Sequence, residues 1–306
     1  MKVSVVVATH AMARFDDFRE AVESVLDQTL VATVVIVVVD GDEAVSDRAL
    51  ALFGDAEGVR LYCNDGNRGV SATRTRGAEL ASGEIVAFID DDAVADPEWV
   101  AEFVRVYRES DAVAVGGRMD GEWLAGRPWY LPEEFDWLVG VTYPGFAEPG
   151  EEVRNTFESN ISFRREAFLD LGGYDPELGP RGDDYSHSEG AEIGARLRAE
   201  YGRGVVYNPD AVVEHKVFER RTRLRWLLER AFEQGVSKRR MAGRSAADGS
   251  EESAYLRRLF FEALPGRVRR FVGSPSAGEF GGIAALLVLT GAVGVGYVYG
   301  ALAEMG

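Results

Sequence analysis

Residues 67–92 read NRGVSATRTRGAELASGEIVAFIDDD, and this stretch decides the fold. Its first half predicts a helix over Gly69–Ala81, and its second half predicts a strand over Glu84–Ile89. The strand is apolar and rich in branched residues, which is typical of a parallel strand buried on both faces. It ends directly in the three acids Asp90–Asp92. A helix that leads into a buried strand is the repeating unit of an α/β sheet.

The same alternation fills the first 116 residues of the chain. Strands are expected at Val3–Ala8, Thr33–Val39, Val59–Tyr62 and Ala112–Val115, and helices at Asp16–Gln28 and from Pro97 to Glu109. This pattern predicts a doubly wound α/β sheet with right-handed crossovers. Ligands of such sheets bind at the carboxyl ends of the strands, where Asp40 and Asp90–Asp92 lie.

The pattern after residue 117 is less regular. Residues 118–158 are expected to be irregular and residues 242–252 to form a linker. Strands are expected at Asn160–Phe163, Val205–Tyr207 and Ala211–Val213, and helices at Arg165–Leu171, Glu189–Glu200 and Arg223–Arg240, the last basic and amphipathic.

The C-terminal segment Phe280–Ala303 has 24 consecutive residues without a charge. As a helix it would span roughly 36 Å, which is enough to cross the hydrocarbon core of a bilayer. Arginines such as Arg267 and Arg270 precede it and only Glu304 follows it, so the positive-inside rule predicts a single-pass protein with the bulk of the chain, residues 1–275, in the cytoplasm. A buried core helix is the alternative. We expect three parts: residues 1–220, a membrane-proximal region at 221–275, and a transmembrane helix at 280–303.

The composition excludes some classes of protein. The net charge is −17, from 51 acidic against 34 basic residues, which argues against a nucleic-acid-binding surface. Such an acid excess suits a salt-rich cytoplasm and favours a halophilic source; arginine in place of lysine also fits a GC-rich genome. Cys63 is the only cysteine, so the chain has no disulfide and no cysteine-based zinc site.

The candidate chemical residues follow strands. Acids packed at the end of a buried strand favour a bound cation, and Mg²⁺ or Mn²⁺ suits carboxylates that share it with substrate phosphates. A solvated acidic turn is the alternative at Asp90–Asp92. Asp40 could accept hydrogen bonds from a ribose or base, or could be a turn or cap residue. His215 could be structural, or could complete a site at the end of its strand.

In their order and spacing, seven segments resemble family-2 glycosyltransferases with the GT-A fold. They are VSVVVATH at 3–10, AVESVLDQT at 21–29, VVVDG at 37–41, residues 67–92 quoted above, NISFRREAFLDLGGYDPEL at 160–178, EGAEIGARL at 189–197 and NPDAVVEH at 208–215. The resemblance covers about residues 1–220. It implies a GT-A-type doubly wound mixed sheet with flanking helices, followed here by C-terminal amphipathic helices and the transmembrane helix.

The resemblance also implies roles for single residues. Ala8, Thr9 and Asp40 would contact the nucleoside, and Arg74 would lie near the nucleotide or its phosphates. Asp90 and Asp91 would lie at the nucleotide-sugar. Asp90 and Asp92 would be the outer acids of a metal-binding motif, with Asp92 as the main ligand of Mg²⁺ or Mn²⁺, and His215 would complete metal or diphosphate binding.

The catalytic base is expected near the start of the helix at Glu189–Glu200. The usual Glu-Asp pair of the family is replaced here by Glu189-Gly190. Glu189 is the preferred base because the positive end of a helix stabilises a carboxylate in the first turn. Asp184, or its neighbour Asp183, and Glu192 are the alternatives.

The expected reaction is an inverting transfer of a sugar from a nucleotide-sugar to an acceptor hydroxyl. The chain is also similar to the haloarchaeal branch that extends dolichyl-phosphate-linked glycans in protein N-glycosylation, including glucuronosyltransferases. This implies UDP-glucuronate as the donor, a polyprenyl (dolichyl) phosphate-linked acceptor, membrane lipid as a partner and no nucleic acid. The alternatives are a dolichyl-phosphate sugar synthase, a non-catalytic nucleotide-sugar-binding scaffold and a glycoside hydrolase; the last would not explain strand-end acids in such a sheet.

Overall fold

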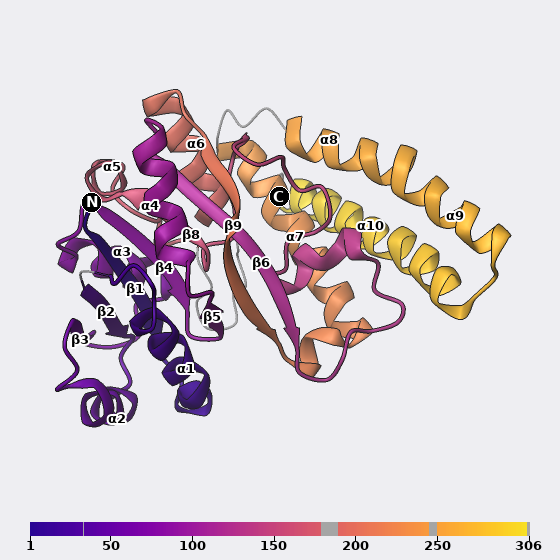
Figure 1. Cartoon of the computed structure of the whole chain (residues 1–306). Coiled ribbons are helices and arrows are strands. Elements are labelled where there is room, and N and C mark those ends of the chain that lie inside the picture. Colours follow the sequence, from indigo (N-terminus) through magenta and orange to yellow (C-terminus); the bar gives the residue numbers. More distant parts are fainter. Residues whose placement is uncertain (33, 179–188, 245–249, 305–306) are drawn as a thin grey trace. The chain divides into compact units, whose positions relative to one another are not determined.

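A computed structural model describes residues 1–306 except 33, 179–188, 245–249 and 305–306. The chain divides into two compact units (Figure 1). The first unit consists of residues 1–120 and 147–215, and the second of residues 121–146 and 216–306. Residues 121–146 therefore pack with the C-terminal helices.

Within the described residues, nine strands form one mixed sheet, ordered β3-β2-β1-β4-β8-β6-β9-β5, with β7 paired to β9. The strands are β1 (Val3–Thr9), β2 (Val34–Val39), β3 (Val59–Cys63), β4 (Ile85–Asp90), β5 (Ala93–Ala95), β6 (Ala114–Trp123), β7 (Glu152–Val153), β8 (Ile161–Arg164) and β9 (Val205–Val217). The first four are mutually parallel, whereas β8 runs antiparallel to β4 and β6. The expected doubly wound mixed sheet is thus confirmed.

Helices cover the sheet of the first unit (Figure 1). They are the 3₁₀ turn η1 (Met12–Arg14) and the helices α1 (Phe15–Leu26), α2 (Glu43–Phe53), α3 (Val70–Leu80), α4 (Trp99–Glu109), α5 (Arg165–Asp170) and α6 (Glu189–Tyr201). All six residues of β2 are buried, as expected for branched residues between two helical layers. Tyr174 packs edge-on against Phe88 and Phe168 at centroid distances of 5.5 and 5.2 Å, which fixes the loop that follows α5.

Three sequence expectations about elements were wrong. The two short strands at 205–207 and 211–213 are parts of the single strand β9, which pairs with β7 at one end and β5 at the other. Pro209 lies between these two ladders, so its missing N–H removes no hydrogen bond from either.

The other two errors concern segments read as irregular. Residues 118–158 contain the end of β6, the 3₁₀ helix η2 (Glu133–Val139) and β7. Within the linker expected at 242–252, one helix continues to Arg244 and another begins at Ser250, where acids in its first turn favour a helix start.

The second unit is mainly helical. It holds η2, the 3₁₀ turn η3 (Glu219–Thr222), α7 (Leu224–Arg244), α8 (Ser250–Arg258), the π-helical η4 (Leu259–Ala263), α9 (Leu264–Gly273) and α10 (Ala277–Ala303). In Figure 1, α10 lies beside α7 and α9. A Cβ at Gly296 would lie 2.0 Å from the carbonyl oxygen of Phe232, so only glycine permits this close packing of α10 on α7.

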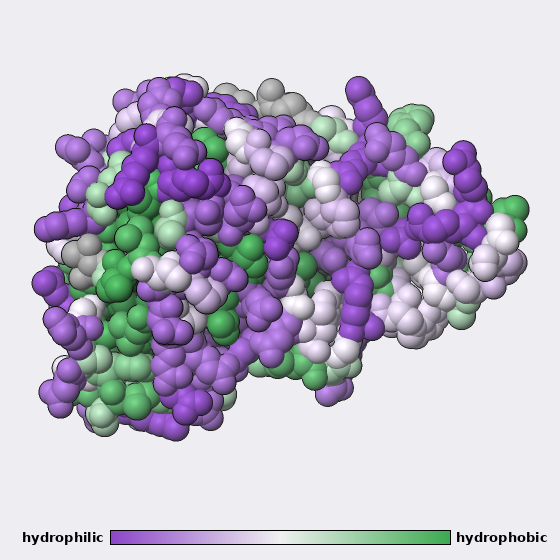
Figure 2. Space-filling view, in the orientation of Figure 1, coloured by the Kyte–Doolittle hydropathy of each residue, from purple (hydrophilic) through white to green (hydrophobic). Residues whose placement is uncertain are grey.

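Among the described residues, α10 is the one helix long and apolar enough to cross a membrane. The most apolar 18-residue window of α10 has a mean hydropathy of 1.9, and 33% of that window is buried. Leu286 and Leu289 are buried in the core of the second unit, whereas Val288, Val295 and Leu302 are 51%, 62% and 60% exposed. Figure 2 shows hydrophobic side chains at the surface where α9 turns into α10, beside strongly hydrophilic ones. One side of α10 is thus packed and the other is apolar and uncovered.

Candidate functional site

The carboxyl ends of three neighbouring strands meet at one edge of the sheet in the first unit. The parallel register aligns Ala8 of β1 with Asp90 of β4, and Thr9 with Val39 of β2. Asp40 directly follows β2. The strand-end residues predicted from the sequence therefore lie along the same edge, as expected for a ligand site of an α/β sheet.

One cluster at this edge, the strand-end group, surrounds two buried acids. Its members are Thr9, Arg14, Asp91, Asp92 and His215. The Thr9 hydroxyl donates to Asp91 Oδ2 at 2.8 Å, and Arg14 Nη1 lies 3.1 Å from Asp91 Oδ1 and 3.3 Å from Asp92 Oδ2. His215 Nε2 is 3.6 Å from Asp92 Oδ1. The short strand β5 explains this meeting, because its residue Ala93 pairs directly with His215.

The strand-end group holds more negative charge than its arginine compensates. Burial raises the pKa of Asp91 to about 7; the charge of Asp92 acts in the same direction, and Arg14 opposes both. Arg14 reaches the pair from a side chain that is 26% exposed. A site with two buried acids and a partly solvated arginine is one that a further cation would stabilise.

The residues present fit a hard divalent cation. Carboxylate oxygen and imidazole nitrogen are both ligands of Mn²⁺, and the 3.6 Å between Asp92 and His215 approaches the roughly 3 Å that separates neighbouring ligands on one ion. In the part of the chain that the structure describes, no three acid, histidine or cysteine side chains converge as a complete metal cage. A cation at Asp92 and His215 would therefore need oxygens from a bound substrate, as is usual for Mg²⁺ at phosphates.

A second cluster, the Arg74 group, lies around a buried arginine of α3. Its members are Arg74, Asp90, Glu158, Tyr174 and Glu189. The Arg74 guanidinium forms an ion pair with Asp90, lies 3.7 Å from Glu189 Oε1 and lies over the Tyr174 ring at 5.9 Å from its centroid. The Tyr174 backbone N–H donates to Thr75 Oγ1 at 3.0 Å, which fixes the loop of Tyr174 against α3. Asp90 is thus paired with Arg74, while Asp92 faces His215.

Glu189 is the first residue of α6 and is 2% exposed. Among the described residues, no group donates a hydrogen bond to its Oε2 atom. Burial raises the pKa of Glu189 to about 8, the nearby charge of Glu158 adds to this rise, and Arg74 opposes it. A buried carboxylate with an unsatisfied oxygen and a pKa near neutrality can accept a proton from a hydroxyl group.

The other predicted acids have different surroundings. Glu192 forms a two-pronged ion pair with Arg196, at 2.5 and 2.6 Å, and Arg196 also donates to the carbonyl oxygen of Gly173 at 2.8 Å. Glu192 therefore orients Arg196, and Arg196 fastens α6 to the loop after α5. Asp183 and Asp184 lie outside the residues that the structure describes.

Asp40 is buried and holds the loop that leads into α3. Its carboxylate accepts hydrogen bonds from the backbone N–H groups of Arg68 and Gly69 and from the Asn64 amide, each at 2.9 Å. These contacts fix the start of α3, and therefore the position of Arg74. Contact of Asp40 with a ribose stays a prediction.

Sequence reasoning missed Arg14, Glu158 and Tyr174. Arg14 carried a weak signal, since it follows the end of β1 by a few residues and sits beside predicted strand-end acids. Glu158 and Tyr174 carried no signal in the sequence, because they lie in loops whose position depends on packing.

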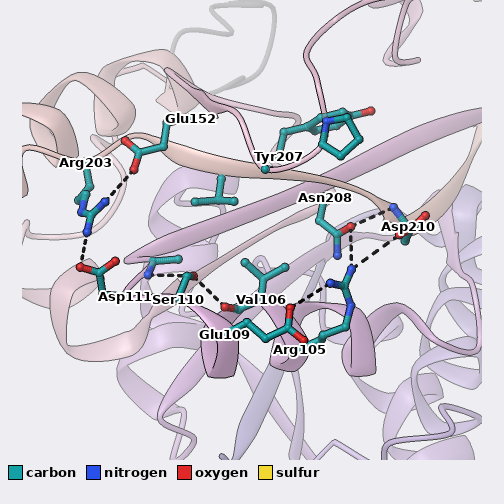
Figure 3. A pocket seen from close by; sticks show the side chains of 14 residues that line it. Arg105, Val106, Glu109, Ser110, Asp111, Glu152, Arg203, Tyr207, Asn208 and Asp210 are labelled. Atoms are coloured by element: carbon teal, nitrogen blue, oxygen red, sulfur yellow. Dashed lines mark hydrogen bonds and ion pairs between the residues drawn. The ribbon is translucent and has the colours of Figure 1, made fainter.

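A hollow of about 520 Å³ between α4 and β9 is separate from both clusters (Figure 3). Its charged residues already pair with one another, for example Arg203 with Glu152 at 3.2 Å.

Comparison with known proteins places the chain among glycosyltransferases. The family model for glycosyl transferase family 2 matches residues 4–172. The chain is 47% identical over 303 residues to the glucosyl-dolichyl phosphate glucuronosyltransferase of Haloferax volcanii, an alignment that covers 99% of this chain and 97% of the relative. It is 27% identical to the succinoglycan biosynthesis protein ExoM of Rhizobium meliloti, over 69% of this chain and 66% of that protein.

Solved structures with the same fold are more distant in sequence. The mannosyltransferase PcManGT of Pyrobaculum calidifontis, solved with GDP-Man and Mn²⁺, has a TM-score of 0.62 at 18% identity, covering 97% of this chain and 87% of that one. TarS of S. aureus, solved with UDP-GlcNAc, has a TM-score of 0.56 at 17% identity, covering 96% and 82%. These likenesses establish the GT-A-like fold. With the family match and the Haloferax relative, they show that this chain belongs to glycosyl transferase family 2.

Proposed function

We propose that this glycosyltransferase moves glucuronic acid from UDP-glucuronate to a dolichyl-phosphate-linked glucosyl acceptor at the cytoplasmic membrane face. The name of the Haloferax relative, 47% identical over nearly the whole of both chains, carries this choice of donor and acceptor. The strand-end group and the Arg74 group supply residues that suit such a transfer. Both arise from segments within residues 1–215.

The donor would bind along the carboxyl ends of β1, β2 and β4. Ala8, Thr9 and Asp40 would lie at the nucleoside, and Asp90, Asp91 and Arg74 at the ribose and diphosphate. Asp92 and His215, with Asp90 as a further predicted ligand, would hold Mg²⁺ or Mn²⁺ together with diphosphate oxygens. Such an ion, when bound, neutralises the charge that develops on the leaving nucleoside diphosphate.

Glu189 would be the general base. As the acceptor oxygen forms its bond to C1 of the glucuronic acid, the bond from C1 to the diphosphate oxygen breaks, and its electron pair leaves with UDP. The acceptor hydroxyl proton passes to the Glu189 carboxylate and then to solvent. Attack opposite the leaving group in one displacement inverts the configuration at C1. Glu189 is buried with an unsatisfied oxygen, whereas Glu192 is held by Arg196. This contrast favours Glu189 over Glu192.

We assign residues 1–220 to catalysis, residues 221–275 to a membrane-proximal helical region and residues 280–303 to the membrane anchor. A single pass would leave the arginines before α10 in the cytoplasm. In the structure α10 lies along α7, which carries charged side chains such as Arg225 and Glu229. For α10 to cross the bilayer, it must therefore separate from α7, because the charged side chains of α7 would be costly in the hydrocarbon core. A cysteine introduced at Glu304, with Cys63 changed to serine, should be labelled only from the outside of sealed cells; labelling from the inside would reject the single pass.

The test of the reaction uses purified full-length protein in detergent with Mn²⁺ and UDP-glucuronate. Glucosyl dolichyl phosphate and bare dolichyl phosphate are offered separately, and the lipids are weighed by mass spectrometry. We expect the mass of one glucuronic acid residue to be added to the glucosyl lipid alone, and Asp92→Ala to abolish the gain. Addition to bare dolichyl phosphate would instead identify a dolichyl-phosphate sugar synthase. Use of another donor in preference would reject the glucuronosyl assignment.

A further inference from the structure

The absence of a side chain at position 190 makes room for a carboxylate from another part of the chain. A Cβ at Gly190 would lie 1.7 Å from Oε1 of Glu158 and 2.7 Å from its Cδ. Both atoms belong to the carboxylate of the loop between β7 and β8. Any side chain at position 190 would therefore exclude Glu158 from the place that it occupies beside the start of α6.

The surroundings of the Glu158 carboxylate suit this place. Its own backbone N–H and that of Gly190, in the first turn of α6, both favour its charged form. The next residue, Ser159, accepts a hydrogen bond at its hydroxyl from the Asp90 backbone N–H at 3.0 Å, which ties the loop to the end of β4. Asn160 is fully buried and binds the Trp99 indole N–H at 2.8 Å. The loop thus brings Glu158 to the same edge of the sheet as Asp90.

The charges around Arg74 exceed what a structural ion pair needs. One guanidinium faces three carboxylates, those of Asp90, Glu158 and Glu189. Asp90 takes the direct ion pair, and Glu189 lies at 3.7 Å. A carboxylate has about four acceptor positions, and backbone N–H groups use at most two of those of Glu158, so it keeps capacity for a bound molecule.

We propose that Glu158 is a second acceptor-side carboxylate of this enzyme, occupying the space left open by Gly190. This inference rests on the function proposed above. Glu158 accepts a hydrogen bond from a hydroxyl of the acceptor sugar, and thereby holds the attacking hydroxyl beside Glu189, which takes its proton. The bonds formed and broken are those already described, and Glu158 takes no proton from the acceptor. It also explains why Gly190 stands where the family resemblance leads one to expect an acid.

A purely structural role for Glu158 is the alternative, because a carboxylate at the amino end of a helix stabilises that helix. Glu158→Gln separates the two roles. The amide oxygen still accepts backbone hydrogen bonds, while the charge is lost. For an acceptor-side role we expect kcat/KM for the lipid acceptor to fall about 10- to 100-fold, the scale of a lost charge-assisted hydrogen bond. The KM for the donor and the Tm should change little.

A second experiment moves the carboxylate from position 158 in the loop to position 190 in α6. Gly190→Asp alone should lower activity because its Cβ displaces the Glu158 carboxylate, and Glu158→Ala alone should lower it because the carboxylate is gone. In the double variant Glu158→Ala/Gly190→Asp the new aspartate occupies the vacated space, and we expect activity well above that of either single variant. The assay measures acceptor kcat/KM and Tm for full-length wild type and all four variants in the same detergent.

The outcomes separate this inference from the proposed function. If wild type ignores UDP-glucuronate, other nucleotide-sugars are tried, and the variants are compared with the donor that it uses; this result rejects only the donor. Unchanged acceptor kcat/KM in Glu158→Gln overturns the inference. So does a double variant that recovers its Tm without recovering turnover, because Glu158 would then serve only to hold α6.

Discussion

The strand-end group and the Arg74 group lie on one sheet edge but are built in different ways. In the strand-end group, three of five members directly end β1 or follow β4, and β5 brings in His215 through one strand pairing. The Arg74 group collects residues 74, 90, 158, 174 and 189 from two helices, one strand end and two loops. A cluster built from strand ends is visible in a sequence, because strand ends are local features. A cluster built from loops depends on the packing of the whole unit.

The two groups also differ in the chemistry that they suit, and the experiments below test this difference and the membrane attachment of the chain. The strand-end group, with its two acids and imidazole, suits a cation and the leaving diphosphate. In the Arg74 group, Glu189 and Glu158 suit the acceptor, whereas Arg74 and Asp90 are proposed to lie at the donor. Loss of Asp92 should abolish donor use, and loss of the Glu189 or Glu158 charge should spare it.

The largest effect is expected at the strand-end group. Asp92→Ala should lower turnover by about 10³-fold or more, because neutralising the leaving diphosphate is worth several kcal/mol in the transition state. Chelation with EDTA should give the same loss in wild type, and added Mn²⁺ should restore it. The matched control is Asp111→Ala, whose acid pairs with Arg203 beside the separate hollow, and it should keep wild-type turnover. Full activity of wild type in excess EDTA would remove the metal from the mechanism.

The next effect is expected at Glu189. Glu189→Gln keeps the shape and removes the charge, and should lower kcat by roughly 10²-fold or more, the usual scale of a lost general base. Affinity for UDP and Mn²⁺, measured by calorimetry, should change little, because these ligands belong to the strand-end group. If Glu189→Gln keeps near-normal turnover while Asp184→Asn does not, the base lies in residues 179–188. A parallel loss of UDP affinity would show that the two groups are not chemically separate.

A smaller effect concerns pH. Burial raises the pKa of Glu189 from 4.5 to about 8, so below pH 8 its carboxyl group is largely protonated and would be unable to act as the proposed base. We expect kcat/KM of wild type to rise about tenfold per pH unit up to this pKa and then to level. Folding stability should change in the opposite sense. The folded state holds this proton more tightly than the unfolded state, so the contribution of Glu189 to stability is full below pH 4.5 and is lost as pH rises through 8.

The rise of kcat/KM with pH that levels near pH 8 should disappear in Glu189→Gln, although the residual rate is small. If this rise persists there unchanged, another group controls it. Asp91, whose pKa is raised to about 7 by burial, would be the first to examine.

The smallest effect on chemistry is expected from the surface of α10. Val288, Val295 and Leu302 are seven residues apart, share one face of the helix and are exposed. Changing all three to lysine should release the protein from liposomes, because apolar surface holds such helices in the membrane. Turnover with a short-chain, water-soluble acceptor should stay within about twofold. The control is Leu50→Lys/Leu52→Lys on exposed positions of α2, which should leave liposome binding intact. Unchanged binding of the triple variant would exclude α10 as the anchor.

The sequence predicted much of the first unit and named Arg74, Asp90 and Glu189 of the Arg74 group, but not Glu158 or Tyr174. Runs such as VVIVVV in β2 have one stable environment, between helical layers, so the parallel strands and their ends followed directly. The pairing of Asp92 with His215 needed β5, a strand of three residues that is too short to show a period. The place of Glu158 could not be predicted, since nothing local to residue 158 indicates that a glycine 32 positions later leaves space for it. Membrane attachment by α10 and the roles of the site residues stay predictions.

The carboxylate of Asp40 has a consequence for how a diphosphate can approach. It already lies at the amino end of α3, bonded to the N–H groups of Arg68 and Gly69. Many nucleotide-binding sheets use such a helix start as a ready-made phosphate receptor. In this chain the receptor is filled by an internal anion, and an incoming diphosphate would meet like charge there. We therefore expect the donor to find its positive charge elsewhere along the edge, from Arg74 and from a cation that enters with the nucleotide as a metal–nucleotide complex.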